Sequence, residues 1–163
     1  MSHEDLLEQL LAEHERLQFA HFDFDDACLI GLDLVETARQ NRQAVSIDIA
    51  VNGQQLFHAA LPGTSPDNDQ WIVRKNRVVG RFFRSSYYIA KLLESRGSSM
   101  EEAYGLSASD YAPFGGAVPV TLKGSGVIGS ITVSGLPDED DHRMVVAAIG
   151  RHLERSRAAC LPV

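Results

Sequence analysis

The sequence predicts an α+β fold: an antiparallel sheet of four to five strands with helices packed on one face. Two candidate hairpins, at residues 45–60 and 117–135, supply the strands, and five segments with helical patterns surround them. The order is two helices, a hairpin, two helices, a long loop, a second hairpin and a last helix. Hairpins dominate this order and nothing in it demands a parallel crossover, so an antiparallel sheet is expected.

Composition limits the class of protein. The chain has 163 residues, 44% of them hydrophobic, which is enough for one core and too apolar for a disordered chain. A net charge of −7 argues against a nucleic-acid partner. No apolar run reaches the roughly 18–20 residues of a membrane-spanning helix, so no membrane insertion is expected. The N-terminus has no signal-peptide pattern, and the only cysteines are Cys28 and Cys160, so we expect a cytoplasmic protein without a disulfide framework.

Two helices are expected before the first hairpin. Residues 3–17 are amphipathic, with Leu6, Leu10 and Leu17 on one stripe and Ser2 as a possible cap. We treat residues 1–20 as a separate N-terminal helix and residues 21–163 as a single domain. The second helix, at about 25–40, repeats apolar residues at helical spacing after the candidate cap Asp23.

The clearest local signal is the first hairpin, AVSIDIAVNGQQLFHAAL. Apolar and polar residues alternate up to Asn52-Gly53, a dipeptide that favours a two-residue type I′ turn. That turn would place Val51 opposite Gln54, Ile49 opposite Leu56 and Ile47 opposite His58. His58 is therefore expected on the apolar, core-facing side, with Asp48 and Phe57 on the other side.

A long helix is expected from Ser65-Pro66 to about Phe83, because proline suits the first helical position. Trp71 and five further apolar residues fall within one sector, and Arg74, Arg77, Arg81 and Arg84 form a separate basic sector. Lys75 lies near the middle of the apolar sector. It either snorkels along the edge of the core or reaches a buried anion or carboxylate.

The last third of the chain is expected to contain a short helix ending near Arg96 with Gly97 after it, then a loop at 98–113 with one helical turn. Pro119 places the first strand of the second hairpin at an edge or a bulge. The last helix follows Pro137 and opens with four acidic residues. His142 lies on its apolar stripe near the N-terminus, where a neutral imidazole packed or hydrogen-bonded against the sheet is expected.

Charge is unevenly distributed. Residues 1–40 hold ten acidic residues and two basic ones, whereas residues 74–96 hold seven basic residues and one acidic one. Solvated helix faces, or pairing between the acidic first third and the basic middle, would explain this pattern. The alternative is an anion site or a surface for an acidic partner.

No catalytic or metal-binding motif is present. The six histidines are scattered, without HExxH spacing or a cysteine pair, so we expect no metal site and identify no catalytic residue. Phe114-Gly115-Gly116-Ala117 could present backbone N–H groups to an anion, or could simply form a bulge or tight bend.

The remaining candidates form a diffuse group of polar and aromatic residues at the ends of elements. If these ends converge, they make a pocket with a basic wall for a small ligand. The predicted ligand-binding residues are His58, Asn68, Asp69, Trp71, Arg74, Lys75, Phe114, Gly115, Gly116 and His142.

Three segments, PDNDQWIVRKNRVVGRFFRSSYY, YAPFGGAVPV and ITVSGLPDEDDH, resemble the haem-degrading-domain (GlcG/HbpS-like) family, within it the branch called uncharacterised protein family 0303. The similarity runs from about Phe22 to the last helix. The pattern positions matched are Asn68, Asp69, Trp71, Arg74, Lys75, Arg84, Ser85, Ser86, Gly115, Gly116, Ser134, Gly135 and His142.

The resemblance implies a profilin-like two-layer sandwich and self-association into dimers or larger assemblies. It names haem as a possible cofactor, although no established haem-ligand motif maps onto these histidines. The first hypothesis is therefore a module that binds a small anionic ligand, haem-like in one version, within a homo-oligomer. The alternatives are a non-enzymatic assembly or adaptor protein, and an enzyme of unknown substrate that uses Lys75 and His58.

Overall fold

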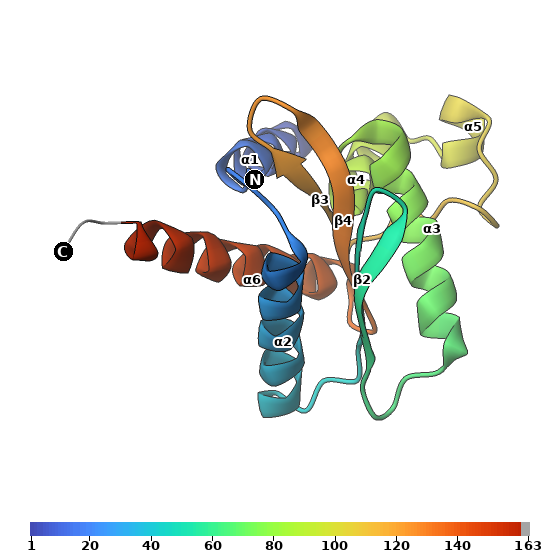
Figure 1. The fold of residues 1–163 in the computed structure, drawn as a ribbon. Coiled ribbons are helices and arrows are strands. Elements are labelled where there is room, and N and C mark those ends of the chain that lie inside the picture. The colour runs from blue at the N-terminus through green and yellow to red at the C-terminus, as the bar shows by residue number, and fades with distance from the viewer. Residues whose placement is uncertain (161–163) are drawn as a thin grey trace.

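A computed structural model describes residues 1–160 of the chain (Figure 1). The order of elements is as predicted, with the expected helical turn in the long loop forming α5. The elements are α1 (His3–Arg16), α2 (Phe24–Gln40), β1 (Ser46–Val51), β2 (Gln54–Ala60), α3 (Pro66–Phe82), α4 (Ser86–Arg96), α5 (Met100–Tyr104), β3 (Ala117–Leu122), β4 (Gly126–Ser134) and α6 (Asp138–Ala159).

The four strands form one antiparallel sheet in the order β2-β1-β4-β3, which confirms the predicted fold class. The expectation that helices cover one face is wrong in one respect. Helices α2 and α6 lie on one face of the sheet, and α3 lies on the other with α4 beside it (Figure 1). The sheet is the middle layer because α3, with Ile72, Val78 and Val79 buried, covers the side that the prediction left to solvent.

The face under α2 and α6 carries the main apolar core. Ile47, Ile49, Ile131 and Val133 are fully buried there and contact apolar residues of both helices. A smaller apolar cluster, Val78, Ile89, Leu93 and Met100, joins α3 to α4 and α5. The alternation in the strands thus correctly predicts the residues of the main core.

The face under α3 is equally buried but polar. Ser46, Asp48, Ser130, Thr132 and Ser134 of β1 and β4 are all at most 5% exposed. Asn76 of α3 bonds both to Asp48 and to Thr132 across this layer. Hydrogen bonds to α3 therefore replace apolar packing over much of this face.

The register of the first hairpin differs from the prediction after its first pair. Val51 does lie opposite Gln54, with both turn residues at positive φ as a type I′ turn requires. A bulge then places Leu56 as an extra residue, so that Ile49 lies opposite Phe57 and Asp48 lies opposite His58. His58 is consequently on the α3 face and exposed, and the prediction that it faces the apolar core is wrong.

The same shift corrects the expectation that Asp48 and Phe57 share a face. Phe57 packs against α2, where its ring fills the space that a Cβ on Gly31 would need. A one-residue bulge reverses every side chain beyond it, and no residue in this strand has the glycine signature that would have indicated it.

The N-terminal segment is attached to the rest of the chain at two places. Helix α1 packs against α4 and buries Leu10, and Leu17 lies within the main core. Phe19 then lies beside β3, where its backbone bonds to Thr121 and Lys123. The division into residues 1–20 and 21–163 stays a prediction, and the last three residues of the second unit lie outside the described residues.

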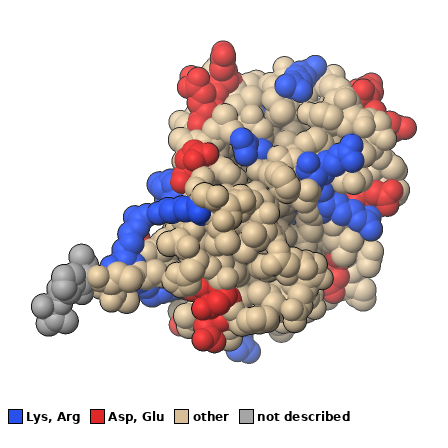
Figure 2. All heavy atoms as spheres, turned by 45° about the horizontal axis from the view of Figure 1, so that its top comes forward, with Lys and Arg blue, Asp and Glu red and all other residues tan. Residues whose placement is uncertain are grey.

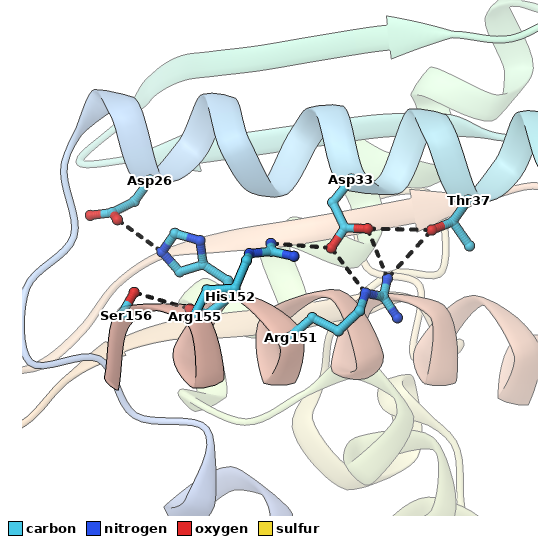
Figure 3. A network of polar contacts seen from close by, with 7 residues as sticks. All are labelled: Asp26, Asp33, Thr37, Arg151, His152, Arg155 and Ser156. Carbon is cyan, nitrogen blue, oxygen red and sulfur yellow. Dashed lines mark hydrogen bonds and ion pairs between the residues drawn. The ribbon is translucent and has the colours of Figure 1, made fainter. Parts of the chain in front are cut away.

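Acidic residues of the first third pair with α6 and not with the basic middle of the chain. Asp33 on α2 accepts two hydrogen bonds from Arg151 and lies 3.4 Å from Arg155 (Figure 3). Asp26 accepts a hydrogen bond from His152. On the face seen in Figure 2, acidic and basic side chains are interspersed between uncharged areas, without one broad patch of a single sign.

Candidate functional site

The predicted ligand-binding residues divide between three places. Asn68, Trp71, Lys75 and Phe114 line one cavity of about 360 Å³ between α3 and the start of α6, hereafter the Lys75 pocket. His58 and Asp69 line a second, and His142 lies apart from both. His58 and Lys75 thus line different cavities, contrary to the prediction that they share one.

Lys75 forms the floor of its pocket. Its ammonium donates to Asp141 Oδ2 over 3.0 Å and to the carbonyl of Val133 over 3.2 Å, and both charged side chains are almost fully buried. Of the two readings of Lys75, the structure therefore supports the one in which it reaches a buried carboxylate. Burial raises the pKa of Asp141 above its ordinary value, against the opposing effects of Lys75 and of two backbone N–H donors.

The two glycines beside this pair provide close backbone approach. A Cβ on Gly115 would lie 1.9 Å from the carbonyl oxygen of Asp138, and one on Gly116 would lie 2.8 Å from Lys75 Nζ. Gly116 also has a φ of 132°, which side chains rarely adopt. This geometry supports the tight-bend interpretation of the segment.

The electrostatics of the Lys75 pocket do not favour an anion. Asp67, Asp138 and Asp141 line it together with one cation, Lys75, which Asp141 already pairs. The guanidinium of Arg74 lies 4.1 Å from the centre of the Trp71 ring and also donates to the carbonyl of Ala108. The basic wall expected from the sequence is thus not formed in this pocket.

His142 is buried, as predicted, but its partners are not in the sheet. Its ring stacks on Tyr87 of α4 at 4.9 Å, and its Nε2 lies 2.7 Å from a carboxylate oxygen of Glu13 on α1. This contact joins the N-terminal helix to α6. It gives His142 a structural explanation that needs no ligand.

A pocket that sequence reasoning missed lies between the Phe19 segment and the second half of α6. We call it the Phe19–His152 pocket; its volume is about 180 Å³. It is lined by Gln18, Phe19, Ala20, His21, Asp26, Lys123, His152, Leu153, Ser156, Arg157 and Cys160. An apolar wall, two imidazoles and two cationic side chains therefore meet at one place.

His152 forms the buried wall of this pocket. It is 4% exposed, and its Nε2 lies 2.8 Å from Asp26 Oδ1 at the start of α2 (Figure 3). Its ring lies 6.3 Å from that of Phe19, and its Nδ1 is buried without a hydrogen-bond partner among the described residues. The sequence contained a signal for this position, because His152 continues the apolar stripe of Val145 and Ile149 at helical spacing.

His21 stands at the mouth of the same pocket, with its side chain 72% exposed and 3.6 Å from Asp26 Oδ2. With Asp23 and Asp26 it forms a group whose donor atoms lie within 4.8 Å of one another. Asp23 and Asp26 already serve as the capping box of α2, each accepting a backbone N–H of the other. That capping explains why the two carboxylates lie together.

Comparison with known proteins places this fold in a family. A family model described as "Haem degrading protein HbpS-like" matches residues 22–150. The chain belongs to this family. A UPF0303 protein of Streptomyces avermitilis is 48% identical over 147 residues, covering 90% of each chain, and one of Streptomyces coelicolor is 49% identical over 145 residues. The resemblance inferred from the three sequence segments is thereby confirmed.

Solved structures agree with this assignment. The Ybr137w protein superposes with a TM-score of 0.85 at 32% identity, covering 92% of this chain and 89% of that one. A structure described as a PduOC:heme complex has a TM-score of 0.64 at 19% identity, covering 79% and 93%, and so shares the fold. Within residues 1–160, no helix combines the length and the apolar character needed to cross a membrane.

Proposed function

We propose that this HbpS-like protein is a non-enzymatic binding module for haem or another planar ligand that carries carboxylates. The observation that carries the proposal is the Phe19–His152 pocket, where apolar side chains, imidazoles and cations line one cavity. Haem combines an apolar ring with anionic propionates and an iron that imidazole ligates. The family description and the haem complex of a protein with this fold support the same choice.

Different residues of the Phe19–His152 pocket would contact the ring, the carboxylates and the metal of such a ligand. Phe19 and Leu153 offer the apolar wall, and the exposed Lys123 and Arg157 offer charge to carboxylates at the rim. His21 is the imidazole proposed to reach a metal, because its side chain is 72% exposed whereas His152 is buried and bonded to Asp26. When bound, haem would supply the iron; the chain itself would position the ring and pair its carboxylates.

The size of the pocket sets how such a ligand would sit. Its volume of about 180 Å³ is below the roughly 300–1,000 Å³ typical of sites that engulf a ligand. One edge of a porphyrin would therefore enter and the rest would stay exposed or be covered by a second subunit. This gives self-association a direct role in ligand binding, and the two exposed, unpaired cysteines fit a reducing cytoplasm.

Titration with hemin tests the proposal. We expect a saturable Soret shift that His21→Ala weakens by about tenfold or more, about 1.4 kcal/mol, with a smaller loss for Lys123→Ala. His58→Ala, an exposed imidazole outside the pocket, is the matched control and should bind as the parent does. The absence of a saturable shift, or one that His58→Ala abolishes and His21→Ala leaves unchanged, would refute the assignment.

A second candidate function, assembly, is favoured by one surface. Phe24, Leu29 and Leu32 of α2 are more than half exposed although all are large and apolar. Light scattering of a Leu32→Arg variant tests whether this surface holds a homo-oligomer together, since a buried arginine would dissociate it. The same mass for variant and parent would remove the outer face of α2 from the interface.

A further inference from the structure

A buried carboxylate on the α3 face lacks a cationic partner. Asp48 is 4% exposed, yet within residues 1–160 its two oxygens accept hydrogen bonds only from the side-chain amides of Gln55 and Asn76. None of the ion pairs within 4.0 Å among residues 1–160 includes Asp48. Lys75 and Asp141 on the same face show the usual alternative, since buried charges in proteins are normally paired.

Asp48 opens into a cavity and not into packed side chains. The cavity has a volume of about 340 Å³ and is lined by Asp48, Gln55, His58, Asp69, Ile72, Val73 and Asn76; we call it the Asp48 pocket. His58 lies directly opposite Asp48 in the register, which brings their Cβ atoms to about 5 Å. Asp69 is one of the α3 residues that line the pocket, and its Oδ1 lies within hydrogen-bond distance of His58 Nε2, at 2.8 Å.

The net charge of this pocket is negative. Two carboxylates line it without a lysine or arginine, which leaves a formal charge of about −2 with His58 neutral and −1 with His58 protonated. One of the two amides that donate to Asp48 is itself held in place, because Asn76 also accepts a hydrogen bond from Thr132. The carboxylate is therefore oriented before any ligand arrives.

We propose that the Asp48 pocket binds a primary ammonium cation carried on a short alkyl chain. The ammonium would donate to Asp48 and Asp69, and Ile72 and Val73 would contact the chain. An ammonium presents three N–H donors, and Asp48 has unused lone pairs because each of its oxygens accepts one hydrogen bond. This site is independent of the proposed haem-type site, with which it shares no residue.

Titration of the protein with n-butylammonium chloride, followed by backbone amide NMR, tests this inference. We expect saturable shifts at Asp48, His58 and Val73. Neutral 1-butanol and an equal concentration of sodium chloride should not reproduce them. Asp48→Asn, which keeps the shape of the side chain, should weaken binding by about tenfold or more.

Two further variants keep the outcome decisive. Asp69→Asn removes a partly exposed charge at the rim and should weaken binding even if Asp48→Asn does not fold. Asp67→Asn removes another carboxylate, two residues away and outside the pocket, and should leave the affinity for butylammonium unchanged. Equal shifts with 1-butanol, no saturation, or equal losses for Asp67→Asn and Asp69→Asn would overturn the proposal.

Discussion

Ile131 and Thr132 are neighbours on β4, both fully buried, and they point to opposite faces of the sheet. Ile131 lies in the apolar core under α2 and α6, whereas Thr132 donates a hydrogen bond to Asn76 of α3. Apolar contacts tolerate small changes of shape, but a buried hydrogen bond fails when one partner is lost. The two faces are therefore held by interactions that differ in tolerance. The Lys75 pocket and the Asp48 pocket, which α3 residues line, both lie on the polar side.

The largest effect is expected at the buried ion pair of the polar face. Lys75→Met leaves the Asp141 carboxylate buried without its cation, and should lower the free energy of unfolding by about 3–5 kcal/mol. Urea denaturation measures it. Adding Asp141→Asn removes the uncompensated charge and keeps an acceptor oxygen for one of the two backbone N–H groups, those of Gly135 and Leu136, so it should recover part of the loss. A single variant as stable as the parent would mean that the pair contributes nothing to the fold.

Two substitutions at neighbouring positions of β4 compare how much stability each face of the sheet loses when one contact is removed. Thr132→Val keeps the shape but leaves the Asn76 carbonyl oxygen without its donor, at a cost of about 2 kcal/mol. Ile131→Val removes one methylene from the apolar face, at a cost of about 1 kcal/mol. Denaturation under one set of conditions compares them. A greater cost for Ile131→Val would contradict the proposed difference in tolerance.

The smallest effect concerns the α2–α6 contact at the edge of the apolar side. Burial acts to raise the pKa of Asp33, but Arg151 and Arg155 outweigh it and hold the pKa below its ordinary value of 3.8. A lowered pKa stabilises the folded state above the ordinary value, and this contribution is lost as pH falls through the folded-state pKa. Asp33→Asn should therefore cost under about 1 kcal/mol at neutral pH, because the pair is partly solvated.

Unfolding measured as a function of pH checks this prediction. The stability of Asp33→Asn and of the parent should converge as pH falls from 3.8 through the lowered folded-state pKa of Asp33, below which the parent carboxylate is also neutral. A stability difference that persists unchanged at acidic pH would show that the side chain acts through shape and not through charge.

Local patterns predicted the helices and hairpins well because their signals lie within a few residues. Asp23 caps its helix, Gly97 ends another in the left-handed conformation, and Asn52-Gly53 makes the tight turn. The composition of the candidate site was predicted less well. Four of its residues share the Lys75 pocket, but the bulge at Leu56 moved His58 to the other face, and His142 bonds to Glu13, which lies 129 positions away.

The sequence by itself determined the fold class, the order of elements, the family and the inward position of Lys75, because periodicity, caps and turn residues act over short distances. Tertiary structure alone decided which carboxylate meets Lys75, which face His58 occupies, and that Phe19, His21 and His152 share a pocket. Those outcomes depend on how α2, α3 and α6 pack across one sheet. Packing joins residues that are far apart in the chain, and no local pattern encodes such pairs.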